Sequence, residues 1–254
     1  MQLRFGLSNV IGSETNRSGS GKTLALCFFI TLAVWLMFSW PLAKHFTGGI
    51  PCSSRNSEKD GEMYMAQGDH LQLLYHFWLV SDMIRGKTRP FYNPYEFNTG
   101  NDQDRYAPGT YYVPFSLFFA AMDFCAGRAA AWNLTGFLSL WLTSFFTWLI
   151  ARRYTDNDLF AGIAAIASIV VPYRWVNLLG GSPSGFAIMW VPMLMFGLDR
   201  AVRDRSLSGG FIAGIALLFA CFTDSHVFLF SAMITPPWCI LALIRSADLN
   251  RRKF

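Results

Sequence analysis

The chain has 254 residues, of which 53% are hydrophobic, 17% aromatic and 15% charged, with a formal net charge of +5. Soluble globular domains carry about 25% charged residues, so this composition argues against a soluble domain. An excess of phenylalanine and tryptophan is typical of membrane proteins, whose aromatic side chains gather at the lipid–water interface. The five cysteines show no CxxC or Cys/His spacing, so they predict neither a zinc site nor a redox pair.

Segment 24–43, LALCFFITLAVWLMFSWPLA, carries no charge and is long enough to cross a bilayer. It is too long for the apolar part of a signal peptide, and no small-residue cleavage site follows it. We therefore interpret it as a retained first span, preceded by a cytoplasmic tail at 1–23. Within this tail, NRSGSGKT resembles a phosphate-binding loop, but Asn16 replaces the required glycine and a membrane helix follows. Nucleotide binding is not expected.

Six further apolar segments follow along the chain, at 111–126, 131–151, 159–174, 186–199, 209–223 and 226–244. Short polar connecting segments, here called joints, separate the apolar segments. Arginines are concentrated in every second joint and in the tail 245–254. The positive-inside rule places these basic joints, and therefore both termini, in the cytoplasm. Segment 111–126 then cannot be a full crossing, because a crossing there would move the basic joints outside.

The charge pattern thus predicts an all-α polytopic membrane protein with about six transmembrane helices. Residues 24–254 would form one membrane domain, and segment 44–130 would be a long external loop. Two helices of this loop, near 69–84 and 111–126, are expected to lie at the membrane interface or to be re-entrant. Several later spans are short and interrupted by proline or glycine, which fits a protein with an internal cavity.

The stretch AQGDHLQLLYHFW, at the start of helix 69–84, mixes polar with apolar residues. On a helix that begins near Asp69, the side chains of Asp69, Gln72 and His76 share one stripe. Apolar residues, among them Leu74 and Trp78, occupy the opposite face. This pattern is typical of a helix that lies at a membrane surface with its apolar side toward lipid or toward the spans.

The predicted topology brings many polar side chains to the outer face: Asp69, His70, Gln72, His76, Arg174, Ser182, Ser184, Asp224, Ser225 and His226. Ionisable groups at membrane depth are costly and are therefore candidates for function. Simpler interpretations remain open for several of these residues. Asp69 could cap a helix, Thr223 or its neighbours Asp224 and Ser225 could cap the last span, and Arg174 could anchor the chain at the interface.

A basic cluster, Arg85, Lys87 and Arg89, follows the predicted interface helix. These side chains could bind the phosphate groups of a substrate or those of lipid headgroups. Glu96 follows in an aromatic, turn-rich loop, FYNPYEFNTGND. Nucleic-acid binding has no support, because the topology already accounts for the basic residues.

Three sequence features resemble the GT-C class of polytopic membrane glycosyltransferases. The first external loop carries GDHLQLLYHFWL and then PFYNPYEF, and a later span ends in paired arginines before a span that ends in PYR. The alternation of short spans continues to TDSHVFLF, so the likeness covers most of 24–245. The resemblance implies transfer of a sugar from a polyprenyl-phosphate carrier to an acceptor on the outer side, in the cytoplasmic membrane of a prokaryote.

The resemblance also implies residue roles. The catalytic base would be Asp69, with Glu96 or Asp60 as weaker candidates. The substrate-binding candidates are His70, Gln72, His76, Arg85, Lys87, Arg89, Glu96, Arg174, Asp224 and His226. Some members hold a divalent metal through acidic residues; Asp69 and Asp224 could contribute here, but no metal site and no cofactor is assigned.

Members of the class usually continue with further spans, so the resemblance implies the N-terminal part of such a protein or a related subunit. One alternative is a non-catalytic membrane subunit that packs against other subunits in membrane lipid. Another is a transporter for a lipid-linked substrate, with Asp224 and His226 suited to proton coupling, although no internal repeats support it. A Ser/His/Asp hydrolase built on TDSH is weakly supported, because adjacent residues rarely reach triad geometry.

Overall fold

The computed structural model describes residues 17–51, 70–95, 100–106 and 109–251, except for the side chains of 17–20, 70–71 and 247–251. These residues form an all-helical fold without a sheet, as the sequence predicted, and contain one isolated bridge between Tyr92 and Tyr106. The helices in chain order are α1 (Arg17–Phe38), α2 (Trp40–Lys44), α3 (His70–Ile84), the short 3-10 helix η3 (Asp102–Arg105), α4 (Phe115–Ala126), α5 (Arg128–Tyr154), α6 (Asp158–Val170), α7 (Pro172–Leu179), α8 (Pro183–Ala187), α9 (Trp190–Arg203), α10 (Leu207–Thr223) and α11 (Ser225–Arg251).

Four helical segments are long and apolar enough to cross a membrane: Gly21–Phe38, Arg128–Tyr154, Pro183–Arg203 and Ser225–Ser246. A fifth is present if α6 and α7 together form one span, bent by 44°. The bend occurs at Pro172, because proline has no backbone N–H to continue the hydrogen-bond ladder. Helix α10 is apolar but has only 17 residues. The lengths therefore support four or five candidate spans.

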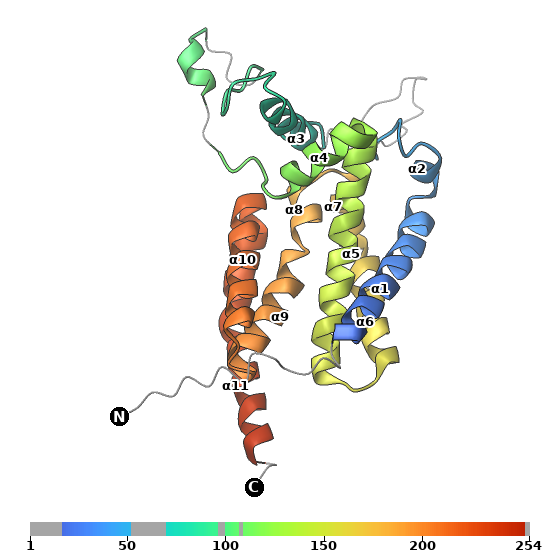
Figure 1. Cartoon of the computed structure of the whole chain (residues 1–254), viewed down its shortest axis with the longest axis vertical. Coiled ribbons are helices and arrows are strands. Elements are labelled where there is room, and N and C mark those ends of the chain that lie inside the picture. The colour runs from blue at the N-terminus through green and yellow to red at the C-terminus, as the bar shows by residue number, and fades with distance from the viewer. Residues whose placement is uncertain (1–16, 52–69, 96–99, 107–108, 252–254) are drawn as a thin grey trace, which may run out of the picture.

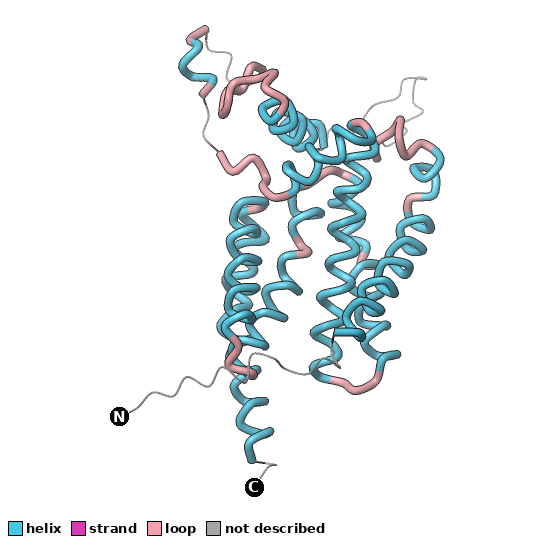
Figure 2. The backbone as a smooth tube through the Cα atoms, in the orientation of Figure 1, coloured by secondary structure: helices cyan, strands magenta, loops and turns pink. Residues whose placement is uncertain are grey.

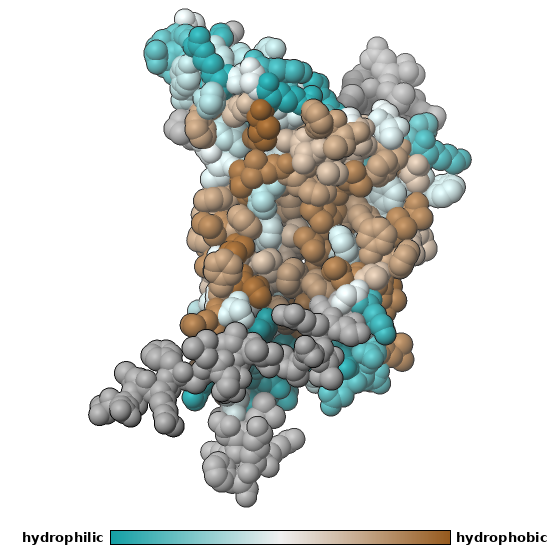
Figure 3. Space-filling model, viewed as in Figure 1, coloured by the Kyte–Doolittle hydropathy of each residue, from teal (hydrophilic) through white to brown (hydrophobic). Residues whose placement is uncertain are grey.

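The long helices run side by side, while α3 and α4 lie across one end of the bundle (Figure 1). We call this end the cavity end, for the cavity described below. Helix α1 begins and α11 ends at the opposite end, and loops gather at both ends (Figure 2). Between the two hydrophilic ends the surface is a broad apolar band (Figure 3). This distribution is the one expected of a protein that lies in a bilayer.

Helix α3 is fixed to the bundle by aromatic packing. The fully buried ring of Phe77 lies 5.4 Å from Phe119 of α4, 5.7 Å from Trp132 of α5 and 6.0 Å from Phe186 of α8, measured between ring centroids. The apolar stripe on Leu74 and Trp78 that the sequence predicted is not the most buried one. Leu73 and Phe77 are buried instead, because α4 and α5 cover this adjacent face, and Val80 is buried in a cluster with Tyr111 of the turn before α4.

Helices α9 and α10 approach each other closely through glycine. A Cβ atom added at Gly197 would lie 2.5 Å from the backbone nitrogen of Ala213. A Cβ atom at Gly209 would lie 2.5 Å from the backbone nitrogen of Ala201. Small residues allow such close packing of helix backbones in membrane proteins.

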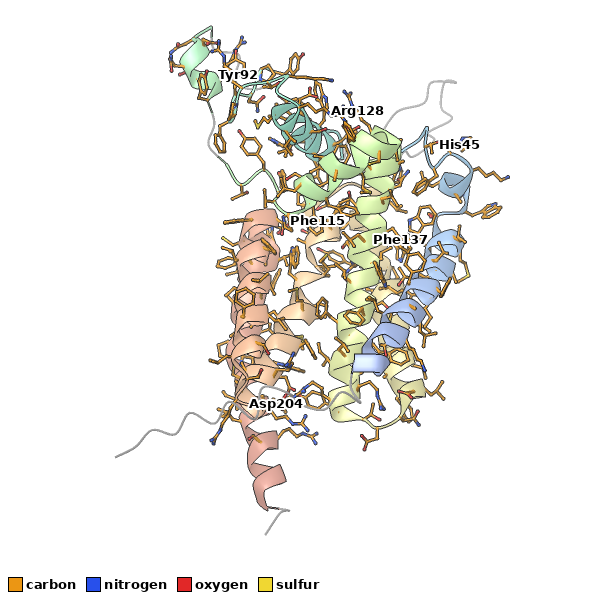
Figure 4. The ribbon with its side chains drawn as sticks, viewed as in Figure 1. His45, Tyr92, Phe115, Arg128, Phe137 and Asp204 are labelled. Atoms are coloured by element: carbon orange, nitrogen blue, oxygen red, sulfur yellow. The ribbon has the colours of Figure 1, made fainter. Side chains whose placement is uncertain are left out.

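The basic joints meet at the end opposite the cavity end, near the labelled Asp204 in Figure 4. Arg153 of α5 binds Asp199 of α9 and donates to Asp204 over 2.8 Å. Arg203 donates from Nη1 to the Arg153 carbonyl over 2.8 Å, and the guanidinium of Arg245 from α11 lies over the Tyr154 ring. We call this region the basic end, defined by Arg153, Asp199, Arg203, Asp204 and Arg245.

Candidate functional site

A cavity of about 570 Å³ opens at the cavity end of the bundle. Five parts of the chain build it: α3, the turn before α4, the start of α7, the start of α8 and the junction between α10 and α11. Its lining residues are Gln72, Leu73, Thr110, Tyr112, Tyr173, Ser182, Pro183, Ser184, Cys221, Phe222, Thr223, Asp224, Ser225, His226 and Phe230. The volume falls within the range of about 300–1,000 Å³ that is usual for small-molecule sites.

Asp224 supplies the carboxylate of this lining. The residue is extended between α10 and α11, and its Oδ1 accepts hydrogen bonds from the backbone N–H groups of His226 at 2.7 Å and Val227 at 2.9 Å. Its Oδ2 accepts a hydrogen bond from the Ser184 hydroxyl at 2.6 Å. Asp224 therefore caps α11, the simpler interpretation that the sequence left open, and also connects α8 to the α10–α11 junction.

His226 is a highly accessible ionisable group of the cavity. Its side chain is 79% exposed, and its Nδ1 lies 3.6 Å from Asp224 Oδ1. A histidine in this position can accept or donate a proton to a molecule in the cavity. Thr223, next to Asp224, accepts a hydrogen bond from the indole N–H of Trp190 at 3.1 Å, which fixes the end of α10 against α9.

The turn before α4 has an uncommon backbone conformation. Tyr111 and Tyr112 have φ angles of 47° and 57°, in the left-handed region that bulky side chains rarely adopt. Tyr112 lines the cavity, and the ring of His76 lies 5.5 Å from Tyr112 and 6.0 Å from Tyr111 between centroids. Strained residues of this kind are concentrated at functional sites.

Of the candidates in the first external loop, Gln72 lines the cavity. His76, also on α3, instead packs against the turn tyrosines Tyr111 and Tyr112. His70 is the first residue of α3, but its side chain lies outside the described residues. Asp69 and Glu96 also lie outside the described residues, so their predicted roles stay predictions.

The basic cluster after α3 is engaged in contacts within the protein. Arg85 forms an ion pair with the buried Asp123 of α4 at 2.9 Å, which ties α3 to α4. Lys87 is mostly exposed and lies 4.0 Å from Asp82. Arg89 is exposed and donates to the Tyr106 hydroxyl at 3.1 Å, a bond that raises the pKa of its guanidinium.

Arg174 does not line the cavity. Its side chain turns into the bundle, is 2% exposed and donates from Nη2 to the Ser139 hydroxyl of α5 at 2.9 Å. Ser139 in turn donates to the Phe186 carbonyl of α8 at 2.6 Å. The bend at Pro172 directs Arg174 inward, whereas Tyr173 faces the cavity.

No group of three His, Cys, Asp or Glu side chains lies close enough to hold a metal ion within the part of the chain that the structure describes. One acidic pair was not anticipated as a site. Asp102 and Asp104 have D-x-D spacing in η3, and Asp102 Oδ1 accepts a hydrogen bond from the Tyr92 hydroxyl at 2.6 Å. Neither aspartate lines the cavity.

The cavity also contains residues that the sequence did not single out, chiefly Thr110, Tyr112, Tyr173 and Cys221. The left-handed backbone at Tyr112 has no signature in the sequence, because glycine rather than tyrosine is typical of that conformation. Tyr173 belongs to the PYR stretch, in which only the neighbouring Arg174 was a candidate. Only the assembled fold brings these residues together.

Comparison with known proteins does not assign the chain to a family: no protein-family model, curated protein or solved structure matches it. The fold itself supports a coarser conclusion. Four to five apolar helices have the length of a membrane span, and an apolar band separates the two hydrophilic ends (Figure 3). The chain is an all-helical protein whose long apolar helices indicate an integral membrane protein, with a polar cavity at one end of its bundle.

Proposed function

We propose that the protein is a GT-C-like membrane glycosyltransferase that moves a sugar from a polyprenyl-phosphate carrier to an acceptor. One observation carries this proposal. The cavity of about 570 Å³ combines Gln72, from the loop segment that resembles the GT-C class, with Asp224, His226 and Ser184 from distant helices. These side chains give one space hydrogen-bond donors and acceptors, together with a group able to transfer a proton.

The proposal includes an orientation in the membrane. The basic end faces the cytoplasm by the positive-inside rule, so the cavity end faces outward. Six crossings follow if the bent pair α6–α7 and the short helix α10 each count as one. Helices α3 and α4 would then lie along the outer membrane surface, over the mouth of the bundle.

The chemistry needs few groups. The acceptor hydroxyl attacks the anomeric carbon, the bond from that carbon to the carrier phosphate breaks, and a base takes the hydroxyl proton. Asp69 is the proposed base, and Gln72 and Ser184 would orient sugar hydroxyls. Asp224 accepts three hydrogen bonds from neutral groups, so it is suited to orient His226 and the substrate rather than to act as the base. The carrier phosphate leaves with the electrons of the broken bond.

The test is turnover in nanodiscs with a panel of polyprenyl-phosphate sugars, followed by mass spectrometry of the released polyprenyl phosphate. Replacing a general base typically lowers the rate by about 100-fold or more, so Asp69→Asn should abolish release. Gln72→Ala and His226→Ala should raise the donor concentration needed for half-maximal rate. Asp158→Asn is the matched control, because this carboxylate is 76% exposed and pairs with Arg152 at the other end of the molecule.

An Asp69→Asn variant with full turnover would contradict the assigned base. Donor binding that depends on Gln72 and His226 but gives no turnover with any acceptor would instead favour a transporter for lipid-linked substrates. Absence of donor binding would favour a non-catalytic subunit. These three results separate the proposed enzyme from its rivals.

A further inference from the structure

A second cavity lies at the basic end, distant from the site described above. Its volume is about 280 Å³, and its lining comprises Arg153, Tyr154, Thr155, Asp156, Arg203 and Arg245. The lining thus contains three arginines, Arg153, Arg203 and Arg245, but only one carboxylate, that of Asp156. We propose that this cavity binds a phosphate group, carried either by an anionic lipid headgroup or by a free phosphate.

The three arginines differ in how far the protein neutralises them. Arg153 is bound by Asp199 and Asp204, and neither carboxylate lines the cavity. Arg203 and Arg245 form no ion pair among the side chains that the structure describes. Each of these two guanidinium groups is therefore available to an anion.

Both available arginines converge on the same aromatic ring. The Cζ atom of Arg203 lies 5.8 Å from the Tyr154 ring centroid, and the Cζ atom of Arg245 lies 5.7 Å from it. They come from different helices, α9 and α11, and bringing two like charges together costs free energy. A phosphate in the cavity that both arginines line would offset this cost, and guanidinium groups bind phosphate through paired N–H donors.

Contacts within the protein position the groups around the cavity. The Tyr154 hydroxyl donates to Asp199 at 2.8 Å, and its ring packs on Trp238 of α11 at 5.8 Å between centroids. Arg203 is positioned by its 2.8 Å bond to the Arg153 carbonyl. A binding site whose groups are already in position loses little entropy when it binds.

The position of the cavity favours a ligand at the membrane surface. It lies at the basic end, where its lining residue Arg153 also binds Asp204, labelled in Figure 4. Basic pockets between membrane helices on the cytoplasmic side are suited to anionic lipid headgroups. A lipid phosphate would reach the arginines from the bilayer, and a free phosphate would reach them from water.

The experiment measures binding of phosphatidylglycerol, phosphatidylcholine and inorganic phosphate to the full chain in detergent, by native mass spectrometry and thermal shift. Arg245→Gln should weaken phosphatidylglycerol binding about fivefold. The reason is that each basic side chain near a membrane surface contributes roughly 1 kcal/mol to the binding of anionic lipid. Arg203→Gln should act similarly. Arg245 makes no described hydrogen bond within the protein, so Arg245→Gln keeps the test valid if Arg203→Gln misfolds.

Arg200→Gln is the matched control, because Arg200 lies on the same helix and donates to Ser208 outside the cavity lining. Phosphatidylglycerol binding that depends on Arg203 and Arg245, without competition from inorganic phosphate, identifies a lipid site. A thermal shift with inorganic phosphate that depends on the same arginines identifies a free-phosphate site. Equal binding by all variants, or an equal loss in Arg200→Gln, would overturn the proposal.

Discussion

Two carboxylates at opposite ends of the bundle, Asp199 and Asp224, are held in different ways. At the basic end, Asp199 is fully buried and is bound by the guanidinium of Arg153 and the hydroxyl of Tyr154. At the cavity end, Asp224 accepts bonds from two backbone amides and from the Ser184 hydroxyl, all neutral donors. The charge of Asp199 is thus neutralised within the protein, whereas the charge of Asp224 borders a cavity large enough for a ligand.

This difference suggests a division of tasks between the ends. Ion pairing at the basic end fixes the ends of α5 and α9 against each other, so its carboxylates serve mainly the fold. Capping at the cavity end satisfies Asp224 without a strong cation, so its remaining charge can act on a bound molecule. If this division is correct, substitution of Asp199 will chiefly change stability, and conservative substitution of Asp224 will chiefly change binding.

The largest expected effect is at Asp199. Asp199→Ala should lower the free energy of unfolding by about 3–5 kcal/mol, because it leaves a partly buried arginine without its main partner. Asp204→Ala is the control, since its side chain is 42% exposed and a pair of this kind contributes about 1 kcal/mol or less. Unfolding in SDS mixed micelles measures both. Equal losses in the free energy of unfolding of the two variants would show that the buried Asp199 stabilises the fold no more than the exposed Asp204.

Two adjacent glycines at the start of α10 give the next effect. A Cβ atom at Gly209 would lie 2.5 Å from Ala201 N and 2.6 Å from Arg200 Cβ, whereas a Cβ atom at Gly210 meets nothing within 4 Å. Gly209→Ala should therefore force α9 and α10 apart and cost about 3 kcal/mol. Gly210→Ala should be neutral or stabilise by up to about 1 kcal/mol through helix propensity. The same unfolding assay compares them, and similar stability for both variants would contradict close packing at this end.

Much of this architecture could be predicted from the sequence, because hydrophobic runs and charge act locally. The runs after 128 mark helices, and the arginines of alternate joints do meet at one end, where Arg203 reaches the Arg153 carbonyl. The capping of α11 by Asp224 was also among the stated interpretations, since aspartate before a helix favours that role. Each of these inferences needed only neighbouring residues or a rule about membrane sides.

Other features depend on contacts between distant segments and could not be predicted. The charge pattern predicted that Arg174 lies at the outer face. The bend at Pro172 instead turns its side chain toward Ser139, 35 residues away in the sequence, and buries it. The buried face of α3 is set by Phe119 and Trp132 from α4 and α5. The cavity likewise joins segments from Gln72 to Phe230, so its composition follows from tertiary packing.

At the cavity end, the ion pair between Arg85 and Asp123 offers a direct comparison with Asp199. Asp123 Oδ2 accepts from Ser81 Oγ at 2.7 Å and from Arg85 Nη2 at 2.9 Å, which joins α3 to α4. Asp123→Ala should cost about 2 kcal/mol, the usual range for hydrogen bonds to a charged group. This loss is smaller than that of Asp199→Ala because Arg85 is partly exposed and can be solvated.

Lys87→Gln is the control and should leave stability unchanged, since Lys87 lies 4.0 Å from Asp82 and is 58% exposed. A loss at Asp123 larger than at Asp199 would reverse the comparison between the ends.

The smallest effect on stability, and the sharpest test of the division, is expected at Asp224. Asp224→Ala removes the cap of α11 and should cost about 1 kcal/mol. Asp224→Asn keeps an oxygen that can accept from the His226 and Val227 amides, so its stability should stay close to that of the wild type. Binding should respond differently, because the asparagine has lost the charge that borders the cavity. We therefore expect Asp224→Asn to weaken binding of a polyprenyl-phosphate sugar while its unfolding curve is unchanged.

Ser184→Ala is the control, because it removes the hydrogen bond between Ser184 and Asp224 but keeps the charge of Asp224. If Asp224→Asn lowered stability as much as Asp224→Ala but left ligand binding intact, the carboxylate would be a structural cap alone, and the two ends would not differ in their tasks.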